Sequence, residues 1–246
     1  MNKIVAMHQP NYLPWIGLFS KISQADCFVI ADTMPFTKHS VTPRNKIRTN
    51  CGWHYLTIPI SPTFQMARIC DVTLPPDGSW QQAHWQLIKD SYGRAEFFAP
   101  HREFFERLYE THFTYLWEIN EQIMLYLLRC FDVNVEVMKA SEMNVDPSLQ
   151  KTDLMIALLK KAGADVYLSG PSGTTYLEEE KFAENNVGLK FFRFEHPEYK
   201  QRFSGFEPNM SAIDLLFNMG PGAAETIRTC GSVEDNCEMQ PSALRD

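Results

Sequence analysis

The chain has 246 residues, of which 44% are hydrophobic and 22% charged, and its formal charge is -7. This composition predicts a packed globular protein and argues against disorder. The length suits one large domain, or one domain with a sizeable insertion. The acidic balance argues against nucleic-acid binding, which needs a basic face, so a site for an anionic ligand has to be local.

No targeting or membrane signal is visible in the sequence. The apolar run after Lys3 has four residues and ends at a histidine, which is too short for a signal peptide. No stretch approaches the length of a membrane span. The cysteines are scattered without a CxxC pair, so we expect reduced thiols and a cytoplasmic protein that does not bind membranes.

Residues 3–32 predict a β-α-β unit. A short apolar strand ends at His8, a turn with two prolines follows, and an apolar-periodic helix reaches Ile22. A continuous apolar run then lies between Asp26 and Asp32, which is typical of a strand buried on both faces. The whole segment has the size of one right-handed crossover.

The turn after the first strand holds the first candidate site residues. Ligands of open α/β sheets bind beyond the carboxyl ends of the strands. His8, Gln9 and Asn11 lie at such a point, and Asp32 shares that edge if the two strands are parallel. The alternative is a turn shaped by its prolines that binds nothing, with Asp32 as a loop or capping residue.

Residues 33–50 are polar and basic. Arginine and lysine bind phosphate and carboxylate through charge-assisted hydrogen bonds, although a solvated loop is the competing interpretation. A β-rich segment follows at residues 53–60. The candidate substrate- or phosphate-binding residues here are Arg44, Asn45, Lys46 and Arg48.

Residues 79–131 change to a helical pattern. Three successive helices without a strand between them predict a helical insertion in the sheet domain. The insertion is rich in aromatic residues and is a candidate homodimer surface. Its histidines do not predict a metal site: His101 and His112 on one helix would lie about 16 Å apart, far beyond the ligand shell of zinc.

The remaining pattern alternates again. Strands are expected at residues 133–138, 164–169 and 189–194, with helices at 153–161 and 175–185 between them. This β-α-β-α-β order predicts an α/β fold with a mostly parallel, Rossmann-like sheet. We expect one domain over residues 1–231 and a disordered tail over residues 232–246.

Two further segments supply candidate ligand-binding residues. The loop after the strand at 164–169 resembles a phosphate-cradling turn, although it has neither the Walker lysine nor GxGxxG, and an ordinary βα turn is the alternative. A second polar cluster surrounds a helix start near residue 211. The candidates in these two segments are Ser169, Gly170, Ser172, Asn209, Ser211 and Asp214.

These residues suggest a site without a covalent nucleophile, since no serine or cysteine lies in a nucleophile elbow. His8 is a candidate acid/base or phosphate donor and Asn11 a candidate orienting residue. Asp32 and Asp214 are the candidate acidic partners. The histidine turn is also similar to that of HIGH-type nucleotidyltransferases, although the HxGH and KMSKS-like segments are absent.

Several motifs together resemble the WbqC-like protein family, over about residues 3–221. They are His8-Gln-Pro-Asn-Tyr-Leu-Pro-Trp15-x-Gly17, Arg44-Asn45-Lys46-Ile47, Gly52 leading into Leu56-Thr57-Ile58-Pro59, Tyr167-Leu-Ser-Gly170, His196-Pro197-x-Tyr199 and Ser211-x-x-Asp214-Leu-Leu-Phe-Asn-x-Gly220.

The resemblance implies a bacterial enzyme of surface-polysaccharide (O-antigen-type) metabolism. The expected activity is acyl or aminoacyl transfer to a nucleotide-activated sugar or a similar phosphorylated small molecule, with no cofactor identified. A nucleotidyltransferase and a non-catalytic partner or sensor in a biosynthetic complex are the alternatives.

Overall fold

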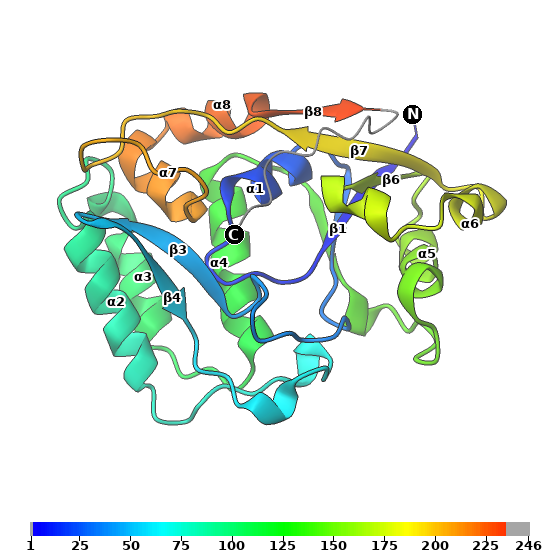
Figure 1. The fold of residues 1–246 in the computed structure, drawn as a ribbon, viewed down its shortest axis with the longest axis horizontal. Helices are drawn as coiled ribbons and strands as arrows, with labels where there is room; N and C mark the ends of the chain where they lie inside the picture. The colour runs from blue at the N-terminus through cyan, green and yellow to red at the C-terminus, as the bar shows by residue number, and fades with distance from the viewer. Residues whose placement is uncertain (1, 235–246) are drawn as a thin grey trace.

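The computed structural model describes residues 2–234, and its centre is a six-stranded sheet in the order β5-β2-β1-β6-β7-β8 (Figure 1). Every neighbouring pair is parallel except β7 and β8. The predicted α/β fold with a mostly parallel, Rossmann-like sheet is therefore confirmed. The strands are β1 (Ile4–His8), β2 (Cys27–Ile30), β5 (Glu136–Lys139), β6 (Val166–Ser169), β7 (Gly188–Phe194) and β8 (Gly231–Glu234).

Helices cover both faces of this sheet. Side chains alternate along β1, so Val5 and Met7 enter one apolar cluster and Ala6 enters the other. The cluster with Val5 is closed by α5 (Lys151–Lys161) and α6 (Glu179–Glu184). The opposite cluster is closed by α1 (Ile16–Ile22), α7 (Ala212–Met219) and α8 (Gly222–Thr229), together with the inserted helices.

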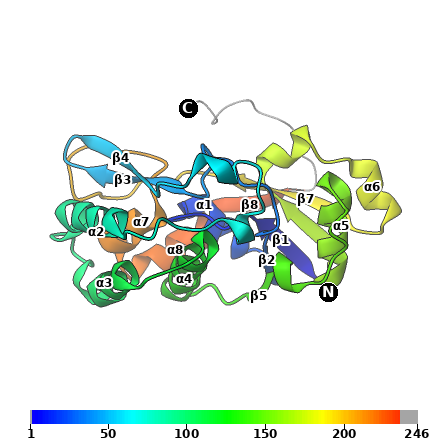
Figure 2. The same ribbon diagram turned by 90° about the horizontal axis from the view of Figure 1, so that it is seen from below.

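The predicted helical insertion is present between β2 and β5, and a hairpin precedes it. In Figures 1 and 2 the hairpin, α2 and α3 lie at one end of the molecule, and α5 and α6 lie at the other. The inserted elements are β3 (Arg44–Thr49), β4 (Gly52–Thr57), α2 (Ser79–Tyr92), α3 (Arg102–Glu110) and α4 (Leu116–Cys130). Short 3-10 helices are η1 (Pro62–Phe64), η2 (Ile69–Asp71), η3 (Ala99–His101), η4 (Ala140–Glu142) and η5 (Pro171–Thr175).

Aromatic side chains of the insertion pack inward. Trp80, Trp85, Phe98 and Phe105 are all buried, and Phe98 and Phe105 pack against Phe217 of α7. A homodimer through this insertion remains a prediction.

The turn between β1 and α1 is held in place by packing and by distant backbone groups. The Trp15 indole lies over Gly17. A Cβ at position 17 would overlap this ring, so the packing of Trp15 requires glycine there. The Asn45 side chain donates to the Leu13 carbonyl at 2.6 Å, and the Ala212 N–H donates to the Pro14 carbonyl at 2.8 Å. The hairpin and α7 thereby fix the path of the turn.

The C-terminal segment departs from the expected boundary. Gly231–Glu234 form β8, which pairs with β7, although a disordered tail was expected from residue 232. The short polar run at Gly231–Glu234 has no visible hydrophobic alternation, but the edge of β7 supplies hydrogen-bond partners for its backbone. The rest of the expected tail, residues 235–246, lies outside the described residues. Within residues 2–234 no helix is long and apolar enough to cross a membrane.

Candidate functional site

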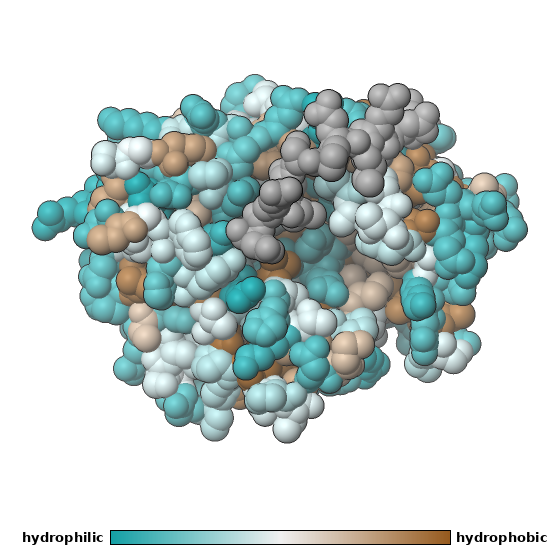
Figure 3. All heavy atoms as spheres, viewed as in Figure 1, coloured by the Kyte–Doolittle hydropathy of each residue, from teal (hydrophilic) through white to brown (hydrophobic). Residues whose placement is uncertain are grey.

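The sheet reverses its winding between β1 and β6. The chain passes from β1 to β2 and then to β5 on one side, and β6, β7 and β8 lie on the other. Such a switch point leaves a crevice outside the carboxyl ends of the two central strands, where α/β proteins bind ligands. His8 ends β1 and Ser169 ends β6. Figure 3, drawn in the view of Figure 1, shows this face hollowed near its centre.

The two central strands separate at this edge. Their last paired residues are Ala6 and Leu168, whereas β1 stays paired with β2 as far as His8 and Ile30. Beyond the end of the β1–β6 pairing, the Met7 carbonyl accepts a hydrogen bond of 3.0 Å from the Lys21 ammonium. A lysine from α1 thus occupies the place where the parallel strands part.

His8 is held as a neutral ring with a defined tautomer. Its Nδ1 lies 2.9 Å from the Gln9 carbonyl oxygen, which can only accept, so Nδ1 carries the hydrogen and Nε2 carries a lone pair. Burial and the positive charge of Lys21 together lower the His8 pKa from 6.5 to about 4, although the hydrogen bond to the Gln9 carbonyl opposes the shift. At neutral pH the ring therefore presents a hydrogen-bond acceptor, which favours the base role over the phosphate-donor role.

Lys21 is a buried cation. Its side chain is only 5% exposed, and within the described residues no acidic side chain forms an ion pair with it. Burial lowers the Lys21 pKa to about 8. A lysine with these surroundings is rare in a purely structural position, and perturbed groups of this kind concentrate in functional sites.

Asn11 contributes an unpaired amide next to the same turn. It is fully buried, and within the described residues neither its Nδ2 nor its Oδ1 has a hydrogen-bond partner. Burying an unpaired polar group costs about 1–3 kcal/mol. Buried groups of this kind usually have a functional reason, which keeps Asn11 among the candidates.

Asp32 lies at the same edge but is already engaged. Its carboxylate accepts from the Ser141 backbone N–H at 2.9 Å and from the Ser141 hydroxyl at 2.6 Å. Burial raises the Asp32 pKa, and the Ser141 hydrogen bonds oppose that rise. Asp32 therefore ties the end of β2 to the end of β5.

Asp214 belongs to a different network. It is fully buried in the first turn of α7 and accepts from the Tyr199 hydroxyl at 2.7 Å and from the Gln201 amide at 2.9 Å. Burial raises its pKa, while the hydrogen bonds from Tyr199 and other neighbours lower it. These contacts hold the loop between β7 and α7, and within residues 2–234 Asp214 forms no hydrogen bond with His8.

The basic residues of β3 have separate neighbours. Arg44 lies over the Tyr55 ring at 4.7 Å and Lys46 over the Trp53 ring at 4.3 Å. Arg48 is 4% exposed and donates to the carbonyls of Thr49, Gly52 and Ser204 at 2.6–2.8 Å, so it fastens the hairpin and is not open to a phosphate. The structure therefore does not gather these residues into one anion clamp.

The other predicted residues support loops near the crevice. The Gln9 side chain accepts from Thr42 at 3.4 Å. Ser169 is buried and its hydroxyl donates to the Gly170 carbonyl at 3.1 Å. Ser172 is exposed in η5, and its carbonyl accepts from the Thr175 hydroxyl.

The backbone conformation and packing at Gly170 do not require glycine. Its φ is -77°, and a Cβ there would meet no atom within 4 Å. The backbone beyond β6 is therefore open on the side where a side chain would otherwise project.

Two predicted residues act at the start of α7. Ser211 is fully buried and caps the helix by accepting from the Ile213 N–H, and its own N–H donates to the Lys46 carbonyl. Asn209 is exposed with a φ of 60°, and its N–H donates to His196 Nε2 at 2.9 Å. Both residues therefore shape the loop that borders the turn.

Comparison with known proteins identifies the family. Residues 9–226 match the WbqC-like protein family. The chain belongs to the WbqC-like protein family. It is also 32% identical over 230 residues to the uncharacterized protein Rv1507c of Mycobacterium tuberculosis, a match that covers 93% of this chain and 99% of that protein. No solved structure matches the chain.

In this WbqC-like protein the sequence did not single out Lys21. The sequence offers one signal, which is the position of Lys21 within an apolar helix. The structure shows that all seven residues of α1 are buried, so the lysine charge lies inside the protein. Asn120 was missed in the same way. It is an amide on the apolar side of α4, and it donates to the Pro10 carbonyl at 3.1 Å and to the Thr42 carbonyl at 2.9 Å.

Within the described chain no group of three or more His, Cys, Asp or Glu side chains lies close enough to hold a metal ion. The chemical core of the candidate site is therefore a neutral imidazole, a buried ammonium and an unpaired amide, contributed by His8, Lys21 and Asn11.

Proposed function

We propose that this protein is a transferase that moves an acyl or aminoacyl group onto an amine of a nucleotide-linked sugar, in bacterial surface-polysaccharide metabolism. The observation that carries the proposal is the neutral His8 ring, which ends β1 beside the switch point, carries its hydrogen on Nδ1 and lies in the field of the Lys21 charge. The family relationship motivates the substrate class.

Acyl transfer needs a base and a group that stabilises an oxyanion, and the turn after β1 offers a candidate for each role. When an amine attacks the donor carbonyl, a C–N bond forms, the nitrogen loses a proton and an oxyanion develops. His8 Nε2 accepts that proton and returns it to the leaving group as the donor's C–S or C–O bond breaks. The positive charge of Lys21 stabilises the oxyanion electrostatically, and the Asn11 amide orients the turn beside it.

The open backbone at Gly170 supports a nucleotide-linked substrate. Close approach of a phosphate to a backbone requires that no side chain project between them, and Gly170 meets that condition at the crevice. Ser172, exposed in the following 3-10 helix, offers a further hydroxyl at the same loop.

Nucleotidyl transfer is the second enzyme reaction to weigh. It requires several cations on a triphosphate, whereas Arg48 is engaged with three carbonyls and Lys46 lies over an aromatic ring. An inaccessible His8 would favour a non-catalytic role, whereas His8 retains partial exposure. Acyl transfer therefore has the better support.

The test is a panel assay. Nucleoside-diphosphate amino sugars are mixed with acyl-thioester or aminoacyl donors, and transfer is detected as a mass increase of the sugar nucleotide. His8→Gln should lower kcat by about 10²–10⁴. The matched control is His112→Gln, which changes an exposed histidine and should retain full activity.

Full activity in the His8→Gln variant would eliminate the base role. Pyrophosphate exchange that requires a nucleoside triphosphate and Mg²⁺, without any acyl transfer, would replace the proposal with nucleotidyl transfer. Failure of the entire panel, with no sugar nucleotide raising the thermal unfolding temperature, would favour the non-catalytic alternative.

A further inference from the structure

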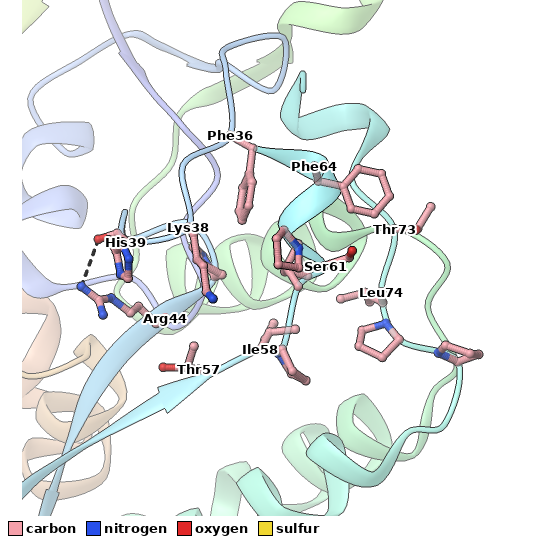
Figure 4. Close-up of a pocket in the computed structure, with 16 residues that line it drawn as sticks. Phe36, Lys38, His39, Arg44, Thr57, Ile58, Ser61, Phe64, Thr73 and Leu74 are labelled. Atoms are coloured by element: carbon pink, nitrogen blue, oxygen red, sulfur yellow. Dashed lines mark hydrogen bonds between the residues drawn. The ribbon is translucent and has the colours of Figure 1, made fainter. Parts of the chain in front are cut away.

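A separate pocket of about 710 Å³ lies beside the hairpin (Figure 4). Segments 36–44, 57–64 and 73–76 line it, so it forms within the insertion and not at the carboxyl edge of the sheet. Its volume falls in the range of small-molecule sites, about 300–1,000 Å³. None of the residues at the crevice contributes to it.

The pocket walls are mainly apolar. Phe36, Ile58 and Ile60 are buried residues of the lining, and Phe64 and Leu74 are half-buried. The remaining apolar lining consists of prolines at positions 43, 59, 62, 75 and 76. Because prolines have fixed φ angles, these walls lose little conformational entropy when a ligand binds.

Cationic and imidazole side chains gather on one side of this pocket. Figure 4 shows Lys38, His39 and Arg44 together, across from Phe64 and Leu74. The Arg44 guanidinium donates to the His39 carbonyl at 3.0 Å and lies over the Tyr55 ring, which fixes its position. Guanidinium has five donors, so most remain available to a ligand.

Acidic residues are absent from the lining, all of which belongs to the described chain. Lys38 also forms no ion pair within residues 2–234. In a chain with a formal charge of -7, a pocket with two cations and no carboxylate has a local charge opposite to that of the molecule. Charge complementarity therefore selects an anionic ligand.

The pocket is connected to the crevice through one short segment. Residues 41–44 face the pocket at Pro43 and Arg44, and the carbonyls of residues 41 and 42 accept from the Tyr12 N–H on the other side. Asn120 bridges the Thr42 and Pro10 carbonyls. Occupancy of the pocket can therefore alter the turn that carries His8.

We propose that this pocket binds an amphipathic anion, a ligand with an apolar body and a carboxylate or phosphate head. The apolar body lies against Phe36, Ile58 and Phe64, and the head binds Lys38 and Arg44. This ligand class rests on the pocket alone and is independent of the proposed function.

Fluorescence titration with 8-anilinonaphthalene-1-sulfonate tests the ligand class, because this probe combines an aromatic body with one anionic group. We expect saturable binding of one equivalent. The neutral ring system N-phenyl-1-naphthylamine should bind roughly ten-fold more weakly, since it lacks the charge-assisted contacts. Octanoate or octyl phosphate should displace the probe and octanol should not, and the stronger competitor identifies the head group.

Variants locate the site. Lys38→Gln combined with Arg44→Gln should weaken sulfonate binding at least about ten-fold and leave the neutral probe unchanged. Lys161→Gln, an exposed lysine at the end of α5, is the matched control and should change nothing. Thr57→Trp places a strand-favouring aromatic residue on the exposed wall and should block both probes while the protein stays folded.

His8→Gln should bind the sulfonate probe with unchanged affinity, which separates failure of this inference from failure of the catalytic proposal. Equal affinity for the charged and neutral probes, displacement by octanol, or unchanged binding in both the double variant and Thr57→Trp would overturn the inference.

Discussion

Replacing Lys21 with methionine should stabilise the protein and abolish its activity. Lys21 is 5% exposed, and burial lowers its pKa from 10.5 to about 8. Since one pKa unit corresponds to about 1.36 kcal/mol, keeping this ammonium charged costs the folded state about 3 kcal/mol at neutral pH. Losing the hydrogen bond to the Met7 carbonyl offsets about 1 kcal/mol, so the net gain should be about 2 kcal/mol.

The pH dependence of this gain follows from proton linkage. Between the folded pKa of about 8 and the unfolded value of 10.5, the unfolded chain binds more protons at Lys21, so the wild-type protein gains stability as the pH rises. The advantage of Lys21→Met should therefore shrink by about 2 kcal/mol between pH 6.5 and pH 9.5.

Urea unfolding of both proteins across this pH range measures the difference directly. Lys161→Met, at an exposed position, is the control and should change stability by no more than about 0.5 kcal/mol at any pH. A Lys21→Met protein that is less stable than wild type, or a difference that does not vary with pH, would refute the buried-charge argument. Retained activity would remove Lys21 from the catalytic site.

Four further predictions concern the turn after β1, the α4 amide that supports it and the backbone beyond β6. Because the His8 pKa is lowered from 6.5 to about 4, the wild type should lose up to about 3 kcal/mol of stability as the pH falls from 6.5 through 4, and His8→Gln should lack this loss in acid-unfolding titrations. Asn120→Leu leaves the buried Pro10 carbonyl unpaired and removes one of the two hydrogen bonds to the Thr42 carbonyl, so it should cost about 1–3 kcal/mol in urea unfolding; a loss below about 1 kcal/mol would mean that the bridge is dispensable. Gly17→Ala should cost about 1–3 kcal/mol because its Cβ overlaps Trp15. Gly170→Ala should leave the unfolding temperature unchanged and weaken sugar-nucleotide binding in a thermal-shift titration; unchanged binding would exclude a close approach of the ligand at this position.

Much of the fold was predictable because hydrophobic patterns report burial directly. The continuous apolar run at residues 27–30 forms β2, a strand buried on both faces. The helical periodicity of residues 79–131 corresponds to the inserted helices. The strand β8 was not predictable, since Gly231–Glu234 carry no alternation and the strand forms on the edge that β7 presents. Its stability comes from tertiary pairing and not from local propensity.

The candidate site was partly predictable for a different reason. A strand followed by a polar turn marks a sheet edge, which singled out His8 and Asn11. The state of a polar group depends on partners distant in sequence, and these are not visible in a local pattern. In the sequence Arg48 has the pattern of a phosphate ligand, but its guanidinium binds backbone carbonyls, one of them at the distant Ser204. Lys21 has the pattern of an ordinary helix lysine, but the whole of α1 is buried.

We expect His8 to be a neutral base with its hydrogen on Nδ1. Two-bond ¹H–¹⁵N correlation spectra of the imidazole, recorded during a pH titration, test it without any substrate. The spectra should show a protonated Nδ1 and an unprotonated Nε2 at pH 7, with a pKa of about 4. A ring that titrates near 6.5, or one with its hydrogen on Nε2 at neutral pH, would contradict it.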